Sequence, residues 1–311
     1  MPTSPVPKHR HHYVWRQYLR AWATDERIWC VAGDRTINPG LMSIAQERDF
    51  YRFQVLNEDD IQFIRKVIGL AIPDLREIHT GTLNLYLQAQ RALGIAKSAG
   101  GHSKELDEAA EALQCNFLED WHTSVEASAH PFVDALIAGD ASFYQSRTSC
   151  IDFATYLATQ HLRTQKHRDL AVHPNSPIDP ATIRRTWPVM VLILATNLAW
   201  HLFASRKEVP LRVIHNETNQ KFITSDQPVL NTLADAVPEG VPPPESALYY
   251  PVSPRVAISI GNDRRVGLTD RIDAIPSQVN WLNRRMASGS HRHVFAATES
   301  ELNGHLAPSG A

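Results

Sequence analysis

The stretch 181–205, ATIRRTWPVMVLILATNLAWHLFAS, decides the fold that we expect for this chain. Its apolar residues run without a break from 189 to 195 and occur on every side of a helix, which is typical of a helix buried all round. The run is shorter than the roughly 20 apolar residues that cross a bilayer, and the polar Asn197 and His201 follow it. The sequence therefore predicts a buried central helix outside any membrane, with His201 as a hydrogen-bonded core residue.

Helical patterns also fill most of the chain before this stretch. Apolar residues at three- and four-residue spacing predict helices within 42–98, where Asn57 or Asp59 can serve as an N-cap. The same spacing predicts helices over 104–138 and 150–169. We therefore expect a mostly helical first two thirds.

Short apolar runs bounded by turn residues predict strands after residue 210. They lie at 211–215, 221–224, 248–252, 256–260 and 293–296, with a helix over 276–287 and an early strand over 28–31. The polar residues 216–219 indicate a hairpin between the first two late strands. We predict a single α+β domain over 9–300, mostly helical, with a small antiparallel sheet from the early strand and the C-terminal strands. Residues 1–8 are expected to be an arm and 301–311 a flexible tail.

The bulk composition limits the partners and the compartment of the chain. Of its 311 residues, 31 are Lys or Arg and 33 are Asp or Glu, so any nucleic acid would have to bind a local basic patch. The cysteines Cys30, Cys115 and Cys150 are odd in number and form no CxxC pair, which argues against a disulfide framework. The N-terminus shows no apolar signal core. We expect a cytoplasmic protein that does not bind membranes.

The stretch 8–20, KHRHHYVWRQYLR, concentrates polar and aromatic residues near the N-terminus. Trp15, Tyr18 and Leu19 follow helical spacing and give one apolar face. The basic and aromatic side chains are typical of a surface that contacts a nucleic-acid backbone and its bases. The alternative, that the aromatics are core residues and the arginines form a solvated rim, is the better interpretation of the helical part because the net charge is near zero. It does not explain the pair His11 and His12.

Two of the predicted helices also place polar residues on one face. Glu119, His122 and Glu126 are three and four residues apart, and such a Glu-x-x-His pair occurs in carboxylate-bridged metal sites. A solvated face is the stronger interpretation of Glu119 and His122, because the pair occurs once. In 150–169, Gln160 and Arg163 lie on the polar side of the helix.

A series of separated motifs resembles the bacterial and fungal family grouped as domain of unknown function 4238. The motifs are His11-His12-Tyr13-Val14 with Tyr18-Leu19, Asp49-Phe50-Tyr51, Glu126, Gln160 with Arg163-Thr164, the segment 222–229 (FITSDQPV), Tyr250-Pro251-Val252-Ser253-Pro254 and Asn280-Trp281-Leu282-Asn283. They extend over residues 9–296, which favours one domain. Two residues depart from the family pattern: Trp15 replaces a proline and Gln227 replaces an asparagine. The resemblance identifies candidate positions and implies no reaction.

The motif residues are typical of a site that handles phosphoryl groups. We expect His11 and His12 to act as base or ligand and Glu126 and Asp226 as catalytic carboxylates. His12, Glu126 and Asp226 form the candidate site for Mg²⁺ or Mn²⁺. The residues expected to bind substrate are Tyr13, Gln160, Arg163, Thr164 and Ser225. Two alternatives stay open: Asp226 caps a turn before Pro228, and Arg163 forms a structural salt bridge with Glu126.

The sequence thus predicts a phosphodiester hydrolase, with a nuclease acting on RNA or DNA as the leading hypothesis. The competing hypothesis is a non-catalytic module that uses the same residues to bind a small ligand, a nucleic acid or a protein. The two hypotheses require the same set of polar residues. They differ in whether the residues carry out a reaction.

Overall fold

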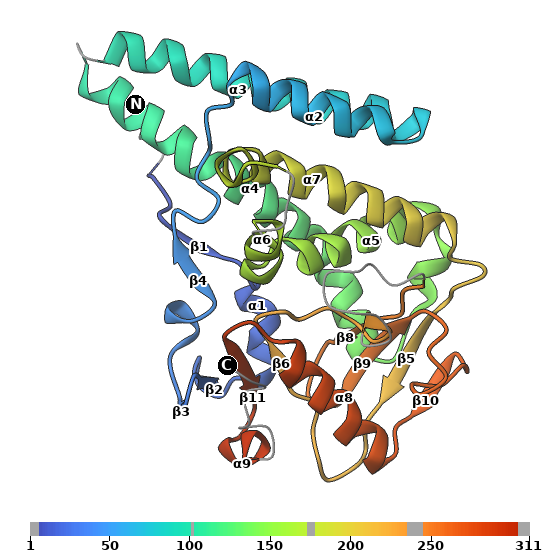
Figure 1. Ribbon diagram of the computed structural model, residues 1–311. Helices are drawn as coiled ribbons and strands as arrows, with labels where there is room; N and C mark the ends of the chain where they lie inside the picture. The colour runs from blue at the N-terminus through green and yellow to red at the C-terminus, as the bar shows by residue number, and fades with distance from the viewer. Residues whose placement is uncertain (1–5, 101–102, 173–177, 235–244, 304–311) are drawn as a thin grey trace.

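The computed structural model describes residues 6–100, 103–172, 178–234 and 245–303. Helices gather at one end of the molecule and strands at the other, as Figure 1 shows. The arrangement is a single α+β domain, as predicted from the sequence. The predicted arm and tail fall largely outside the described residues.

Six helices make up the helical end. They are α2 (Glu58–Leu70), α3 (Pro73–Gly100), α4 (Lys104–Ile137), α5 (Arg147–Leu162), α6 (Gln165–Ala171) and α7 (Pro180–Ala204). The first begins where expected, because the Asn57 side chain accepts a hydrogen bond from Asp60 N and the Asp60 side chain accepts one from Asn57 N. The last begins at a cap as well, since Asp179 accepts from Thr182 N.

Helix α7 is the predicted central helix, and it packs against α5, α3 and α2. Its run 189–195 is buried apart from two half-buried positions, and Asn197 Oδ1 accepts a hydrogen bond from His79 Nε2 at 2.8 Å. The prediction for His201 was wrong, because its side chain is exposed. Within the described residues, α7 alone is long and apolar enough to cross a membrane by length and composition. In this structure α7 packs against the helices α2, α3 and α5.

The predicted helix 150–169 is divided in two. Helix α5 ends at Leu162, and Thr164 is extended (φ −82°, ψ 160°) before α6 begins. Two contacts stabilise the break between α5 and α6. The Arg163 side chain reaches across to Glu126 of α4, and the Thr164 hydroxyl donates to Gln227 Oε1 in the strand region. Tertiary contacts therefore override the helical pattern of the sequence.

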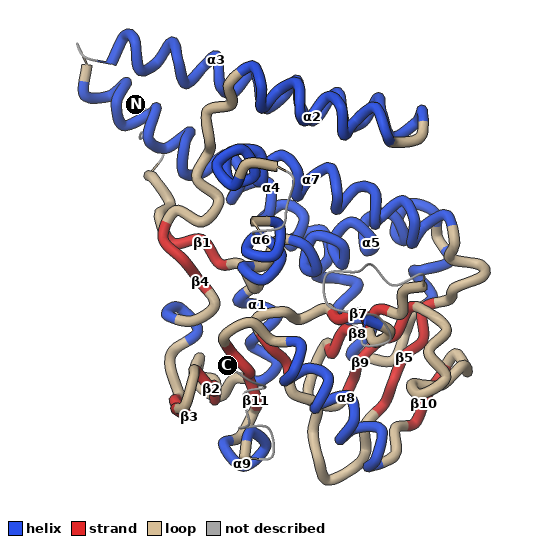
Figure 2. Tube along the Cα trace, in the orientation of Figure 1, coloured by secondary structure: helices blue, strands red, loops and turns tan. Residues whose placement is uncertain are grey.

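The strands form three small sheets, and Figure 2 shows the two larger ones at the end of the molecule away from α2 and α3. The two-stranded sheet pairs β1 (Arg10–His12) with β4 (Gln46–Arg48). The five-stranded sheet has the order β10 (Arg271–Asp273), β5 (Leu211–His215), β9 (Val256–Ile260), β8 (Leu248–Pro251) and β7 (Leu230–Asn231). The four-stranded sheet has the order β3 (Arg35–Ile37), β2 (Trp29–Ala32), β11 (His293–Ala296) and β6 (Thr224–Ser225). Pairing is antiparallel except between β10 and β5.

The predicted hairpin between 211–215 and 221–224 was wrong. Strand β5 pairs with β9 and β10, whereas β6 pairs with β11 in the other sheet. Asn216 organises the connection, because its side chain accepts from Thr218 N at 3.0 Å and donates to Gln220 O at 2.8 Å. The turn residues were recognised, but they lead the chain from one sheet to another.

The N-terminal segment binds the sheets together through α1 (Arg16–Leu19) and the following 3₁₀ turn, Arg20–Trp22. The indole of Trp22 donates to Phe222 O at 2.8 Å, and the hydroxyls of Tyr18 and Thr224 share a hydrogen bond of 2.6 Å. The ring of Tyr18 also stacks on Tyr250 of β8, with the ring centroids 5.0 Å apart. Its aromatic residues are thus core residues. The remaining short elements are α8 (Pro276–Gly289), α9 (Glu299–Leu302) and the 3₁₀ turns Leu41–Ser43 and Ser142–Gln145.

Two glycines give a matched test of this packing. We expect Gly261→Ala to destabilise the protein by about 2 kcal/mol or more, because its φ is +143° and a Cβ there would lie 2.3 Å from Ala247 Cα. Gly94→Ala, inside α3 with nothing within 4 Å of the new Cβ, should instead stabilise by about 0.5–1 kcal/mol. Denaturant unfolding of both variants checks the pair. Equal stability of the two would contradict the packing between β9 and the chain before β8.

Candidate functional site

A pocket of about 460 Å³ lies between the N-terminal segment, α4 and the end of α5. Its interior is lined by five ionisable side chains, and basic residues of the N-terminal segment lie around them. The interior residues are His12, Glu119, His122, Glu126 and Arg163, and the basic residues are Lys8, Arg10, Arg16 and Arg20. The pocket therefore combines acid–base groups with cations.

An ion pair between two helices anchors the interior. Arg163, whose side chain is 1% exposed, donates from Nη2 to Glu126 Oε1 and, at 3.2 Å, to Gln160 Oε1. Burial alone would lower the pKa of Arg163, but the carboxylates of Glu126 and Glu119 and the phenol of Tyr51 outweigh this effect and raise it. The salt bridge that the sequence left open as an alternative is thus present. It does not remove either residue from the pocket.

Among the described residues, several buried polar atoms around this pair have no hydrogen-bond partner. They are His12 Nε2, Glu119 Oε2, Nδ1 and Nε2 of His122, Gln160 Nε2 and Arg163 Nε. Buried polar groups in folded proteins are nearly always paired, and groups left over at one place indicate a ligand or bound water. These groups gather where the pocket is, which is the physical reason for treating it as the functional site.

Burial also shifts the ionisation of the unpartnered groups. It raises the pKa of Glu119 from 4.5 to about 7, while Arg163 opposes the shift and Glu126 adds to it. The pKa of His12 is lowered by burial and by the neighbouring Arg16 cation, and burial lowers that of His122 well below 6.5. At neutral pH both histidines are therefore uncharged. Glu119 exchanges a proton close to pH 7, which is the property of an efficient general acid or base.

The prediction of a solvated face for Glu119 and His122 was wrong. His122 is 2% exposed, and its ring lies 4.3 Å from that of Tyr51, centroid to centroid. The N-terminal segment covers this face of α4: Lys8 N donates to Asn116 Oδ1 at 2.7 Å, and Asn116 Nδ2 donates to Val6 O at 3.0 Å. The three- and four-residue spacing of Glu119, His122 and Glu126 indicated that they share a face of the helix. It could not indicate that the N-terminal segment covers that face.

The two adjacent histidines have different roles. His11 is fully buried, and both ring nitrogens are occupied: Nε2 donates to Lys8 O at 2.6 Å, and Nδ1 accepts from Tyr51 N at 2.7 Å. These two bonds fix a neutral tautomer. His12, on the opposite face of β1, lines the pocket. Hence His12 is available for chemistry, whereas His11 holds the segment in place.

Of the residues predicted to bind substrate, only Arg163 lines this pocket, and Gln160 lies behind it, where its Oε1 accepts from Arg163. Thr164 Oγ1 donates to Gln227 Oε1, and Ser225 Oγ donates to Gln227 O at 3.0 Å. Tyr13 is 2% exposed, in the hydrophobic core. The structure therefore assigns Tyr13, Thr164 and Ser225 to packing around the strand region. Gln227 joins that network by donating to Val229 O at 3.0 Å.

Asp226 also lies away from the pocket, with 1% of its surface exposed. Its two carboxylate oxygens accept hydrogen bonds from His291 N at 2.8 Å, Arg292 N at 2.7 Å and His293 N at 3.0 Å. The open alternative for Asp226 was a cap of its own turn. The structure has it capping the loop before β11, some sixty residues further along the chain.

The predicted metal ligands His12, Glu126 and Asp226 do not form a common site. The oxygens of Asp226 are taken by backbone amides, and Glu126 Oε1 is taken by Arg163. In the part of the chain that the structure describes, three possible metal ligands of the His, Cys, Asp and Glu types converge at one place, which is formed by His9, Glu111 and Cys115. The donor atoms at the predicted positions therefore do not fit Mg²⁺ or Mn²⁺ as a shared ion.

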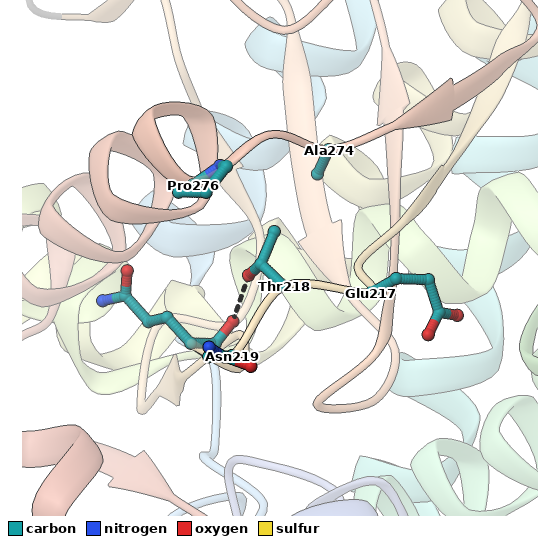
Figure 3. Close-up of a pocket in the computed structure, with 6 residues that line it drawn as sticks. Glu217, Thr218, Asn219, Ala274 and Pro276 are labelled. Carbon is teal, nitrogen blue, oxygen red and sulfur yellow. Dashed lines mark hydrogen bonds between the residues drawn. The ribbon is translucent and has the colours of Figure 1, made fainter.

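A larger hollow of about 600 Å³ lies beside the turn after β5 and the start of α8, and Figure 3 shows it in close-up. Its labelled residues are Glu217, Thr218, Asn219, Ala274 and Pro276. The hydroxyl of Thr218 donates to Gln220 O at 2.9 Å and is thus occupied. The hollow has one acidic residue and no histidine or basic residue in its lining. It lacks the groups of a catalytic site, and size alone does not make it one.

The comparisons with known proteins add a family. A family model whose description reads "Protein of unknown function (DUF4238)" matches residues 10–186 and 190–300. The match covers nearly the same residues as the resemblance seen in the motifs. Neither the curated proteins nor the solved structures gave a match.

The position of Asp226 predicts a loss of stability on substitution. Asp226→Asn should destabilise the protein by about 1–3 kcal/mol, because an amide can accept through one oxygen only and its NH₂ group would face a backbone N–H. Asp273→Asn is the matched control, since that side chain is 73% exposed, and it should change stability by less than about 0.5 kcal/mol. Thermal and denaturant unfolding measure both. Similar effects for the two variants would show that the three backbone contacts are unimportant.

The raised pKa of Glu119 predicts a pH-dependent stability. Between pH 4.5 and about 7 the folded protein holds a proton on Glu119 that the unfolded chain releases, so this stabilising contribution is full at low pH and is lost as pH rises. Glu119→Gln removes the loss, and its free energy of unfolding relative to wild type should increase by roughly 2–3 kcal/mol from pH 5 to pH 8. Urea unfolding across this range provides the measurement. A difference that stays constant from pH 5 to pH 8 would contradict the raised pKa of Glu119.

Proposed function

We propose that this chain, which belongs to the DUF4238 family of proteins of unknown function, is a phosphodiester hydrolase that acts on nucleic acid. One observation carries the proposal: unpartnered buried acid–base groups lie in the same pocket as a set of basic side chains. Phosphodiester cleavage needs a base, an acid and positive charge near the phosphate. A site for an uncharged small molecule would not need the cations.

The charges around the pocket are only partly neutralised. Lys8 pairs with Asp120 at 2.6 Å and Arg20 with Glu26 at 2.7 Å. Arg10 and Arg16 line the pocket and have no ion-pair partner among the described residues. A phosphate group would meet the guanidinium groups of Arg10 and Arg16 there, and Arg16 Nη1 donates to Met42 Sδ, which is a weak acceptor. Guanidinium matches phosphate through paired N–H donors. Local charge can thus attract nucleic acid to a chain with a net charge of −2.

The interior residues have complementary roles in this proposal. His12 is neutral, and its unpartnered Nε2 takes the proton of the attacking water or hydroxyl. Glu119, protonated in part at pH 7, returns a proton to the leaving oxygen. Arg163, held by Glu126, faces the charge that develops on the phosphoryl oxygens. Each proton that His12 removes is matched by one that Glu119 supplies.

A reducing cytoplasm fits the same proposal. The three cysteines are free and buried, and none is joined by a disulfide bond. Free buried thiols persist where the surroundings are reducing. Nucleic acid is available as a substrate in that compartment.

The test is cleavage of end-labelled RNA and DNA by the wild type and by His12→Gln and Glu119→Gln. Each substitution should lower the rate constant by about 10²–10⁴-fold. The wild type should show a bell-shaped pH profile, since His12 must be unprotonated and Glu119 protonated, and the alkaline limb should fall near pH 7. Glu119→Gln should lose that limb.

The matched controls are His201→Gln on α7 and Glu77→Gln on α3, both exposed and outside the pocket. Each should retain wild-type activity. The assay is run with Mg²⁺, with Mn²⁺ and with a chelator, beside a thermal melt of each variant. Wild-type protein that binds labelled RNA or DNA but cleaves neither under any of these conditions would contradict the hydrolase and favour the non-catalytic binding module.

A further inference from the structure

A second group of polar side chains lies outside the pocket, where the segment before β1 and the turn after β4 meet α4. It consists of His9, Asp49, Glu111 and Cys115. Cys115 is fully buried, whereas the side chains of His9, Asp49 and Glu111 are 33%, 26% and 37% exposed. An ion from solution could therefore reach the thiol past the other three. The proposed hydrolase does not use any of the four.

The distances from Cys115 Sγ to the other donor atoms are close to those of a tetrahedral metal site, and His9 approaches Glu111 Oε1 through Nε2 at 3.9 Å. Cys115 Sγ lies 3.6 Å from His9 Nδ1, 3.5 Å from Glu111 Oε1 and 3.9 Å from Asp49 Oδ1. Zinc bonds of about 2.0–2.3 Å arranged as a tetrahedron place neighbouring ligand atoms roughly 3.3–3.7 Å apart. The contact of 2.8 Å between His9 Nδ1 and Asp49 Oδ1 is shorter, because these two atoms share a hydrogen bond. A cation between them would replace that proton.

The neighbouring Arg52 already donates to two of these side chains. Its Nη1 donates to Glu111 Oε1 at 2.7 Å and to Cys115 Sγ at 3.2 Å, while its Nη2 donates to Glu111 Oε2 at 2.7 Å and to Gln114 Oε1 at 3.0 Å. A metal bound to Glu111 Oε1 and Cys115 Sγ displaces Nη1 from both atoms, while Nη2 keeps both of its acceptors. The guanidinium then orients the ligating carboxylate through its second oxygen, as hydrogen-bonded neighbours of metal ligands commonly do.

We propose that His9, Glu111 and Cys115, with Asp49 as the fourth ligand, bind a Zn²⁺ ion. One imidazole, one thiolate and two carboxylates are the donor types that zinc takes in proteins. Binding replaces the thiol proton of Cys115, which is released to solvent. The ion joins the segment before β1 to α4 and stabilises the arrangement that places His12 and Glu119 in one pocket. Its role is structural, since all four ligand positions come from the protein.

The experiment uses the purified full chain, stripped with a chelator and titrated with Zn²⁺ against a chromophoric chelator. We expect one Zn²⁺ per chain, a raised melting temperature, and thiolate-to-metal absorption when Co²⁺ replaces Zn²⁺. His9→Gln, at a partly exposed position that the fold tolerates, should weaken binding by at least about tenfold. Cys115→Ser should abolish the Co²⁺–thiolate absorption.

Two controls separate this site from other thiols and from the pocket. Cys150→Ser removes another buried free cysteine, and Glu119→Gln removes a pocket carboxylate; both should bind Zn²⁺ as the wild type does. Wild-type protein that takes up no Zn²⁺, or His9→Gln that binds it with unchanged affinity, would overturn the proposal and leave the cluster an ion-pair network. The outcome is independent of any hydrolytic activity.

Discussion

The buried guanidinium of Arg163 is the constraint on which the rest of the site depends. A charge with 1% exposure is stable only when it is paired, and Glu126 supplies the partner from another helix. The side chain reaches that partner because α5 stops at Leu162. The carbonyl of Arg163 accepts from the Tyr51 hydroxyl at 3.2 Å, so the same residue also holds the turn after β4. One ion pair thus joins α4, α5 and the N-terminal region.

Because Arg163 pairs with Glu126, the second glutamate of the pocket, Glu119, has an unusual ionisation. Glu126 neutralises the cation, and so the nearby Glu119 is buried without a full charge to offset its own. Its pKa rises to about 7 as a consequence. The alternation of β1 then decides which histidine faces this carboxyl: His11 points into the core and His12 to the pocket. Sites with perturbed carboxyl groups are common at functional positions, which is why this pocket ranks above the larger hollow.

Local chemistry was readable from the sequence, and long-range pairing was not. Asn57 and Asp179 were recognisable as helix caps because a cap acts within three residues. The strands 211–215, 248–252, 256–260 and 293–296 were placed well, but the predicted strand 221–224 overlaps β6 at Thr224 only. The hairpin after β5 was wrong, since the choice of partner depends on strands far along the chain. The role of Asp226 could not be predicted for the same reason, because the backbone amides that it accepts from lie beyond residue 290. Burial of Glu119 depends on a segment a hundred residues earlier.

The N-terminal segment explains why both proposed sites occur on the same helix. Residues 6–12 lie along α4, fixed by Asn116, and their successive side chains contribute to the metal cluster, the core and the pocket. His9 lies beside Cys115, His11 bonds Lys8 and Tyr51, and His12 lines the pocket. The stretch rich in histidine is therefore not one catalytic group. It is a strap in which His9 contacts Asp49 and Cys115, His11 is buried, and His12 lines the pocket. The acid–base groups of α4 become a buried site only when that strap is in place.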